Sequence, residues 1–334
     1  MRIGSWNAPP LSVYRPLGDL CVKVFFMITA YLFVGKIIDS SKRPIDWLAL
    51  FVSRVLRLTP LYLVAMAALL AMVGTLTHWT LQESLDLLLN HTGQWLTFTM
   101  VDIPDINRLP QTSLLVAGVT WSLAYEWLFY LSLPLLALVL TRRVPAATVL
   151  ICTSFALWLI AIKAAVIFPW SFVVGAAAAV VARTEFVAKW LRGGGAAIAA
   201  VAALATVVLG QDPGPAKASV PALVVFFIPI ACGNSLLGIL TNRPALLLGE
   251  VSYGLYLLHG LLLTIVFHLM LGVPLAKTLS PLQHWVVVAG AGCVLVVIAS
   301  LTFKWIERPC MNSVPSVAAW LTKCASRPIR ETKA

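Results

Sequence analysis

The most conspicuous shortage in this 334-residue sequence is charge, because only 11% of the residues are charged whereas 60% are hydrophobic. A soluble domain carries about 25% charged residues, since water-facing surface must be covered with polar groups. The shortage therefore excludes an ordinary soluble enzyme. A net charge of +11 does not indicate nucleic-acid binding, because the basic residues are scattered between apolar runs and form no cluster in a soluble domain.

The patterns of common metal and nucleotide sites are lacking as well. The six cysteines include no C-x-x-C pair, so they predict neither a zinc site nor a disulfide framework. His259 and His268 are nine residues apart, which puts them on opposite faces of a helix. The glycines at 193–195 are not followed by the Lys-Ser/Thr pair of a phosphate-binding loop. We therefore expect no bound metal or cofactor.

Long apolar runs fill the rest of the chain, whose mean hydropathy is +0.92. A transmembrane helix needs about 20 predominantly apolar residues. The sequence thus predicts an all-α fold, a polytopic transmembrane helical bundle of about nine spans. These spans are expected near residues 20–38, 57–77, 119–140, 146–164, 168–183, 195–211, 219–238, 251–271 and 284–304.

The remaining segments are short. The more polar stretch 79–118 is predicted to form an interfacial helix followed by a loop. We assign residues 1–310 to one membrane domain and residues 311–334 to a short basic tail, with Pro309 ending the last helix. Of the 24 Lys and Arg residues, 17 fall on one side of the predicted membrane. Basic residues favour the cytoplasmic side, so the C-terminus is predicted to be cytoplasmic and the N-terminus external.

One carboxylate is expected deep inside a span. Of the 13 acidic residues, all except Glu126 fall in predicted loops or at span ends. A charged group in hydrocarbon is costly and is a functional candidate by default. Ser122, Glu126 and Tyr130 are spaced i, i+4, i+8 and share one helix face. Such a carboxylate suits proton transfer or hydrogen bonding to a substrate hydroxyl. The alternative is a structural anchor between helices.

Two arginines lie at the predicted start of the second span, in FVSRVLRLTPLY. Arg54 and Arg57 are i, i+3 neighbours on a helix surface. Two guanidinium groups at this spacing can clamp the phosphates of a cytosolic ligand. The alternative is ordinary anchoring to lipid headgroups.

Polar residues recur near the C-terminal end. Ser252, Tyr256 and His259 lie along one stripe of a predicted helix, which indicates either a wet cleft or a lone structural histidine. Glu307 and Arg308 end the last predicted span. We expect Glu307 to pair with one of the two arginines on the same side of the membrane.

Five segments, in order along the chain, resemble motifs of acyltransferase family 3, the multi-span membrane O-acyltransferases of bacterial surface polysaccharides. They are GDLCVKVFFMITAYLF (18–33), FVSRVLRLTPLY (51–62), TWSLAYEWLFYLSLPLL (120–136), LGEVSYGLYLLHG (248–260) and FKWIERP (303–309). Thr29-Ala30 stands where the family usually has Ser-Gly. This departure keeps the hydroxyl but is expected to lose a close backbone approach at the glycine position.

The resemblance implies O-acylation, usually O-acetylation, of a hydroxyl on a cell-surface polysaccharide, a lipopolysaccharide or a lipid-linked sugar at the bacterial inner membrane. It implies cytosolic acyl-CoA as co-substrate, a saccharide acceptor and the lipid bilayer as partners, and no nucleic acid. Arg54 and Arg57 would contact the donor phosphates, and Glu126 and His259 are the candidate catalytic residues. The other candidate substrate-binding residues are Tyr62, Trp121, Ser122, Tyr130, Tyr253, Tyr256 and Glu307.

The family pattern has ten spans, and its first helix carries an Arg and a His thought to act as base. Met1 to Leu17 resembles only the loop after that helix, and no His precedes His78. We therefore expect this helix to be missing from the sequence. Four functions stay open: an acyltransferase whose sequence begins too late, a truncated inactive homologue, a transporter or flippase of lipid-linked glycan, and a non-catalytic membrane partner.

Overall fold

A computed structural model describes residues 11–40, 44–141, 144–162, 170–209 and 219–325. The end of the predicted basic tail lies outside these residues, as do Lys42, Arg43, Arg142, Arg143, Lys163 and Lys217, on which the predicted orientation partly depends. Every regular element within the described ranges is a helix, which confirms the all-α prediction.

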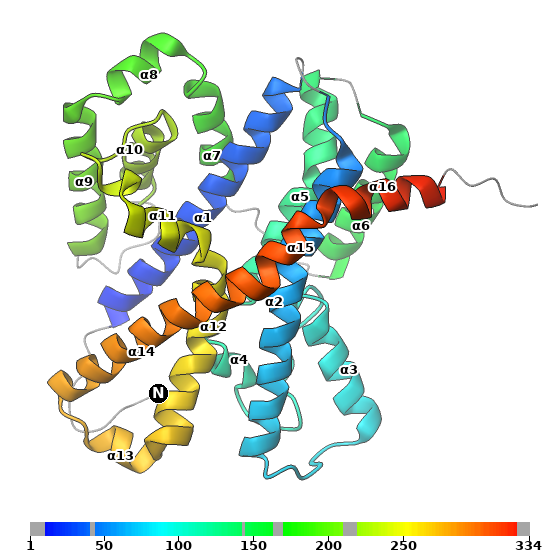
Figure 1. The fold of residues 1–334 in the computed structure, drawn as a ribbon, viewed down its shortest axis with the longest axis vertical. Coiled ribbons are helices and arrows are strands. Elements are labelled where there is room, and N and C mark those ends of the chain that lie inside the picture. Colours follow the sequence, from blue (N-terminus) through cyan, green and yellow to red (C-terminus); the bar gives the residue numbers. More distant parts are fainter. Residues whose placement is uncertain (1–10, 41–43, 142–143, 163–169, 210–218, 326–334) are drawn as a thin grey trace, which may run out of the picture. The chain divides into compact units, whose positions relative to one another are not determined.

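The chain forms two compact units. The first unit consists of residues 1–43, 120–250 and 265–290. In it α1 packs along α7, α5 packs against α1 and α6, and α9 runs beside α10 (Figure 1). Its helices are α1 (Leu11–Asp39), α5 (Trp121–Thr141), α6 (Ala146–Ile162), α7 (Trp170–Val181), α8 (Glu185–Leu191), α9 (Gly194–Leu209), α10 (Ser219–Ala231), the 3₁₀ turn η1 (Ile239–Thr241), α11 (Arg243–Glu250), the π-helical η2 (Ile265–Met270), α13 (Gly272–Thr278) and the beginning of α14 (Pro281–Thr302).

The second unit consists of residues 44–119, 251–264 and 291–334. It is built around α2, against which α3, α12, η3, α15 and α16 pack (Figure 1). Its elements are α2 (Trp47–Leu76), α3 (Leu85–Leu96), α4 (Thr112–Leu115), α12 (Ser252–Thr264), the rest of α14, the π-helical η3 (Phe303–Glu307), α15 (Arg308–Asn312) and α16 (Val314–Ala325).

The helix lengths refine the nine predicted spans, each of which is helical at its centre among the described residues. Five helical stretches are long and apolar enough to cross a bilayer, and α7 with α8, bent by 109°, makes a sixth. The other three predicted spans correspond to shorter apolar helices. The prediction was too long for α10, which ends at Ala231 because Gly233 turns the chain with a φ of +97°.

The contact between α1 and α7 depends on a glycine. A Cβ atom on Gly175 would lie 2.2 Å from the Met27 carbonyl oxygen and 2.8 Å from the Ala30 Cβ. Small residues let helix backbones approach in lipid, where van der Waals packing drives association. The close approach that we expected to be lost at Ala30 is therefore present at this point of α1, because the partner helix supplies the glycine.

The predicted end of the last helix is wrong. The chain continues past Pro309, and Pro281–Cys324 is one apolar helical stretch, so part of the predicted basic tail is helical (Figure 1). The Arg308 N–H bonds to the Phe303 carbonyl, five residues earlier. A proline ring clashes with the carbonyl four residues before it, and the wider π turn relieves this clash. Glu307 therefore lies within a continuous helical stretch and not at its end.

The glycine contact predicts that Gly175→Ala destabilises the protein. The new methyl group would overlap the Met27 carbonyl, and overpacking of this kind costs about 1–3 kcal/mol. The thermal midpoint in detergent should fall, as measured by loss of the monodisperse peak after heating. Gly290→Ala is the matched control, because nothing lies within 4 Å of its Cβ position. Equal midpoints for the two variants would contradict the close approach.

Candidate functional site

Three glutamates are buried among the described residues. Glu83, Glu126 and Glu307 are exposed by 7%, 3% and 0%, respectively. Glu126 belongs to the first unit, whereas Glu83 and Glu307 belong to the second. Only Glu126 was expected deep inside a span, because the sequence placed the other two in a loop and at the end of a span.

Glu126 lies within α5, and Tyr130, one turn later, donates a hydrogen bond to its Oε1 atom. This contact confirms that the two side chains share a helix face. The Tyr130 ring also packs edge-on against Phe33 of α1, with the ring centroids 5.1 Å apart. Ser122 is buried on the same helix. The carboxylate is thus held by a hydroxyl among apolar and aromatic groups, an environment that suits proton transfer.

Trp121 begins α5 and differs from its neighbours because 40% of it is exposed. Its ring meets Phe26 edge-on at a centroid distance of 6.3 Å and Tyr125 at 5.6 Å. The indole is therefore held at a fixed angle while part of its surface stays accessible. Such a ring can pack against a flat or apolar part of a substrate.

The two arginines do not begin their helix. Because α2 starts at Trp47, Arg54 and Arg57 lie roughly two to three turns inside it. Both are partly buried. Arg54 donates to the Ser53 hydroxyl over 3.3 Å, whereas the Nη1 atom of Arg57 lies 3.7 Å from the sulfur of Met311. The two guanidinium groups therefore have different surroundings, which the i, i+3 spacing did not indicate.

The tyrosines predicted to bind substrate in the second unit all donate hydrogen bonds to backbone carbonyls. The bonds run from Tyr62 to Trp95 over 2.6 Å, from Tyr253 to Leu58 over 2.9 Å and from Tyr256 to Val119 over 2.9 Å. Each bond joins segments that are distant in sequence. In the structure these hydroxyls hold the backbone in place, a role that the motif alone did not indicate.

His259 is partly buried in α12, with its Nδ1 atom 2.8 Å from the Tyr256 carbonyl oxygen. A carbonyl only accepts hydrogen bonds, so Nδ1 carries the proton. A neutral imidazole then keeps its lone pair on Nε2, which can take up a proton from a ligand. Ser252, the first residue of this stripe, is exposed. Across the described ranges, no three His, Cys, Asp or Glu side chains gather to hold a metal ion.

Glu307 lies in η3, which packs against α2. Neither carboxylate oxygen has a hydrogen-bond partner in the part of the chain that the structure describes. Met311, one helical turn after Glu307, contacts Arg57 of α2, so Glu307 lies on the side of its helix that faces Arg57. The two groups nevertheless form no direct ion pair within the described ranges. The ion pair that we expected between Glu307 and one of the two arginines is therefore not formed within the described residues.

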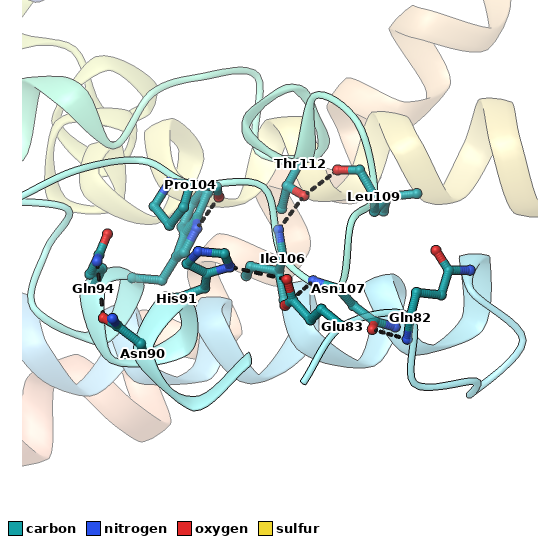
Figure 2. Close-up of polar contacts among 11 residues, drawn as sticks. Gln82, Glu83, Asn90, His91, Gln94, Pro104, Ile106, Asn107, Leu109 and Thr112 are labelled. Carbon is teal, nitrogen blue, oxygen red and sulfur yellow. Dashed lines mark hydrogen bonds and ion pairs between the residues drawn. The ribbon is translucent and has the colours of Figure 1, made fainter. Parts of the chain in front are cut away.

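A polar network surrounds Glu83, and the sequence did not predict it (Figure 2). Glu83 Oε1 accepts a bond of 2.8 Å from the Asn107 N–H, and its Oε2 lies 3.4 Å from the His91 Nδ1. The Asn107 amide donates to the Thr77 hydroxyl and to the Thr80 carbonyl over 3.0 and 2.8 Å. The polar composition of 79–118 was the one signal that could have indicated this network.

The backbone between residues 78 and 117 has an unusual conformation. Eight residues other than glycine adopt positive φ there, namely His78, Trp79, Phe98, Thr99, Asn107, Arg108, Gln111 and Ala117. Residues in such conformations cost free energy and persist only where their surroundings determine them. The hydrogen bonds of Glu83 and Asn107 help to hold this backbone in place, so the segment is an ordered part of the second unit.

Comparison with known proteins gives one match. Residues 3–305 match a family model described as an acyltransferase domain. This range includes four of the five motif segments and the beginning of the fifth. No curated protein and no solved structure matches the chain.

The network predicts that Asn107→Ala destabilises the segment 77–112. The change removes the side-chain bonds to the Thr77 hydroxyl, the Thr80 carbonyl and the Gln82 N–H, at a cost of about 1–3 kcal/mol for each group left unsatisfied. The backbone N–H of residue 107 continues to donate to Glu83. Hydrogen exchange across the segment should accelerate at least tenfold. Asn90→Ala is the control, because Asn90 is exposed and accepts one bond, from Gln94, within the same segment (Figure 2). Unchanged exchange in Asn107→Ala would refute the network's role.

Proposed function

Because the chain belongs to acyltransferase family 3, we propose that it transfers an acyl group, usually acetyl, from cytosolic acyl-CoA to a hydroxyl of a cell-surface polysaccharide or lipid-linked sugar. Family membership supports acyl transfer in a membrane, and the donor and acceptor are part of the proposal. The observation that carries it is Glu126, a carboxylate only 3% exposed in an apolar helix and bonded to the Tyr130 hydroxyl. A charged group in such a place indicates function.

In the proposed reaction the acceptor hydroxyl oxygen attacks the thioester carbonyl carbon. The hydroxyl loses its proton to a base, the C–S bond breaks, and the CoA sulfur takes up a proton. Glu126 is the proposed base, with Tyr130 fixing its orientation. His259 is the second candidate, since a neutral imidazole keeps a lone pair on Nε2. A positioned base accelerates such a step by about 10²–10⁴-fold.

Recognition of the donor is assigned to two arginines for reasons of charge. Acyl-CoA is polyanionic, and guanidinium groups bind phosphate oxygens in a bidentate geometry that Lys lacks. Arg54 and Arg57 are both partly buried, which reduces the screening of their charges by water and salt. We therefore assign recognition of the donor's phosphates to these two residues.

We also propose that the protein is a multi-pass protein of the bacterial inner membrane with its C-terminus in the cytoplasm. The excess of Lys and Arg on that side supports this orientation. A phosphatase fused to the C-terminus, which is active only outside the cytoplasm, should therefore be inactive. A fluorescent protein that fails to mature outside should be bright at the same position. The opposite pair of signals would overturn the orientation.

For the activity, membranes that contain the chain should transfer labelled acetyl from acetyl-CoA to an endogenous saccharide. Glu126→Gln should lower kcat by about 10²-fold or more, because the amide cannot accept the proton. Glu185→Gln is the matched control, since Glu185 is exposed on α8 and should behave as the wild type.

Two outcomes would count against the proposal. If folded wild-type protein consumes no acetyl-CoA in these membranes, the enzyme assignment fails, and a transporter or an inactive homologue becomes the better interpretation. If Glu126→Gln retains full kcat while His259→Gln loses it, His259 replaces Glu126 as the proposed base.

A further inference from the structure

The turn of α2 that carries Arg57 contacts two parts of the chain that are distant in sequence. The carbonyl of the next residue, Leu58, accepts the hydrogen bond from Tyr253 of α12. The Met311 sulfur of α15 lies 3.7 Å from Nη1. Glu307 ends η3 and lies one helical turn before Met311, so it is on the side of its helix that faces Arg57. Helices α12 and α15 and the turn η3 all pack on α2, so the turn that carries Arg57 is fixed from several sides.

The guanidinium keeps most of its hydrogen-bonding capacity. Arginine has five N–H donors. The one contact found for Arg57 within the described ranges is with sulfur, a weak acceptor. Donors on a partly buried arginine in a fixed position are available for an anionic ligand. Arg54, in contrast, donates to Ser53 on its own helix.

Glu307 has acceptor oxygens that no donor in the described part of the chain uses. It is completely buried, and among the described residues both of its oxygens lack a hydrogen-bond partner. Burial of an unpaired carboxylate is costly, and a buried ion pair that only stabilised the fold would be expected to bring the two groups into direct contact. The carboxylate also sits at the end of a π-helical turn, a distortion that is frequent at functional sites.

We propose that Glu307 is a positioning residue for Arg57: its carboxylate attracts and orients the guanidinium without occupying its donors, and Arg57 thereby stays preorganised to bind a phosphate of acyl-CoA. This inference rests on the proposed acyl-CoA-dependent function. Preorganisation raises affinity because the side chain does not have to be ordered when the ligand binds. Glu307 acts through Arg57 and does not touch the donor.

The test is a double-mutant cycle on the purified full chain in detergent, with labelled CoA as the binding probe. We expect Glu307→Gln, which removes the charge but keeps the volume, to weaken CoA binding about tenfold, or about 1.4 kcal/mol. The same change in an Arg57→Ala background should have no further effect. In an Arg54→Ala background it should again weaken binding about tenfold. Glu185→Gln serves as the control for the loss of one negative charge.

A second variant separates orientation from packing. Glu307→Asp retains the charge but shortens the side chain, so its CoA affinity should lie closer to that of the wild type than that of Glu307→Gln does. Equal losses in the Asp and Gln variants would show that Glu307 acts through packing and would overturn the inference. A Glu307→Gln effect that persists undiminished without Arg57 would overturn it as well.

The result also separates this inference from the proposed function. If the wild type binds CoA, shows the Arg57-specific coupling and transfers no acetyl, the proposed function fails and the positioning role stands. If acetyl transfer occurs but the coupling is absent, the positioning role alone fails. If the wild type does not bind CoA, the assignment of the donor site fails together with the role of Glu307.

Discussion

Polar groups that are buried in hydrocarbon must find their partners inside the protein, because no water is present to supply them. This constraint explains why the described chain is helical throughout its regular elements, since a helix satisfies its own backbone. It also explains the behaviour of the tyrosines. The hydroxyls of Tyr62, Tyr253 and Tyr256 each donate to a carbonyl on another segment, so they satisfy the hydroxyl and fix the packing at the same time.

The three buried glutamates differ in the partners that they find within the protein. Glu83 takes part in a network with Asn107 and His91, which is typical of a structural group that holds an ordered segment. Glu126 accepts a hydrogen bond from Tyr130 and lies in an apolar helix, where a buried carboxylate is a candidate functional group. Glu307 has no hydrogen-bond partner in the described residues and lies one helical turn before Met311, which contacts Arg57.

A close helix contact and a local helix distortion both position side chains in this fold. Gly175 lets α7 approach the backbone of α1, and the π turn of η3 lets the helix pass Pro309. Either feature would be unfavourable in an isolated helix, since glycine and a widened turn weaken it. Here the first brings two backbones together, and the second places Glu307 next to α2.

Local patterns in the sequence were enough to predict the all-α class, the centres of the nine apolar helices and the contact between Glu126 and Tyr130. Apolar run length reports on the surrounding solvent, and i, i+4 spacing fixes neighbours within one helix. The motif resemblance identified the family correctly. Each of these predictions depends on residues that are close together in the sequence, either within one helix or within one short motif.

Only the tertiary structure could show that Glu307 is buried, that Arg57 contacts Met311, 254 residues later, and that Tyr253 bonds to a carbonyl 195 residues away. These facts depend on which helices pack together, and spacing along the chain carries no information about that. The sequence determined that this protein is a helical membrane acyltransferase by family, because composition and motif order are local. Packing decided what surrounds each polar side chain, because burial is a property of the assembled helices.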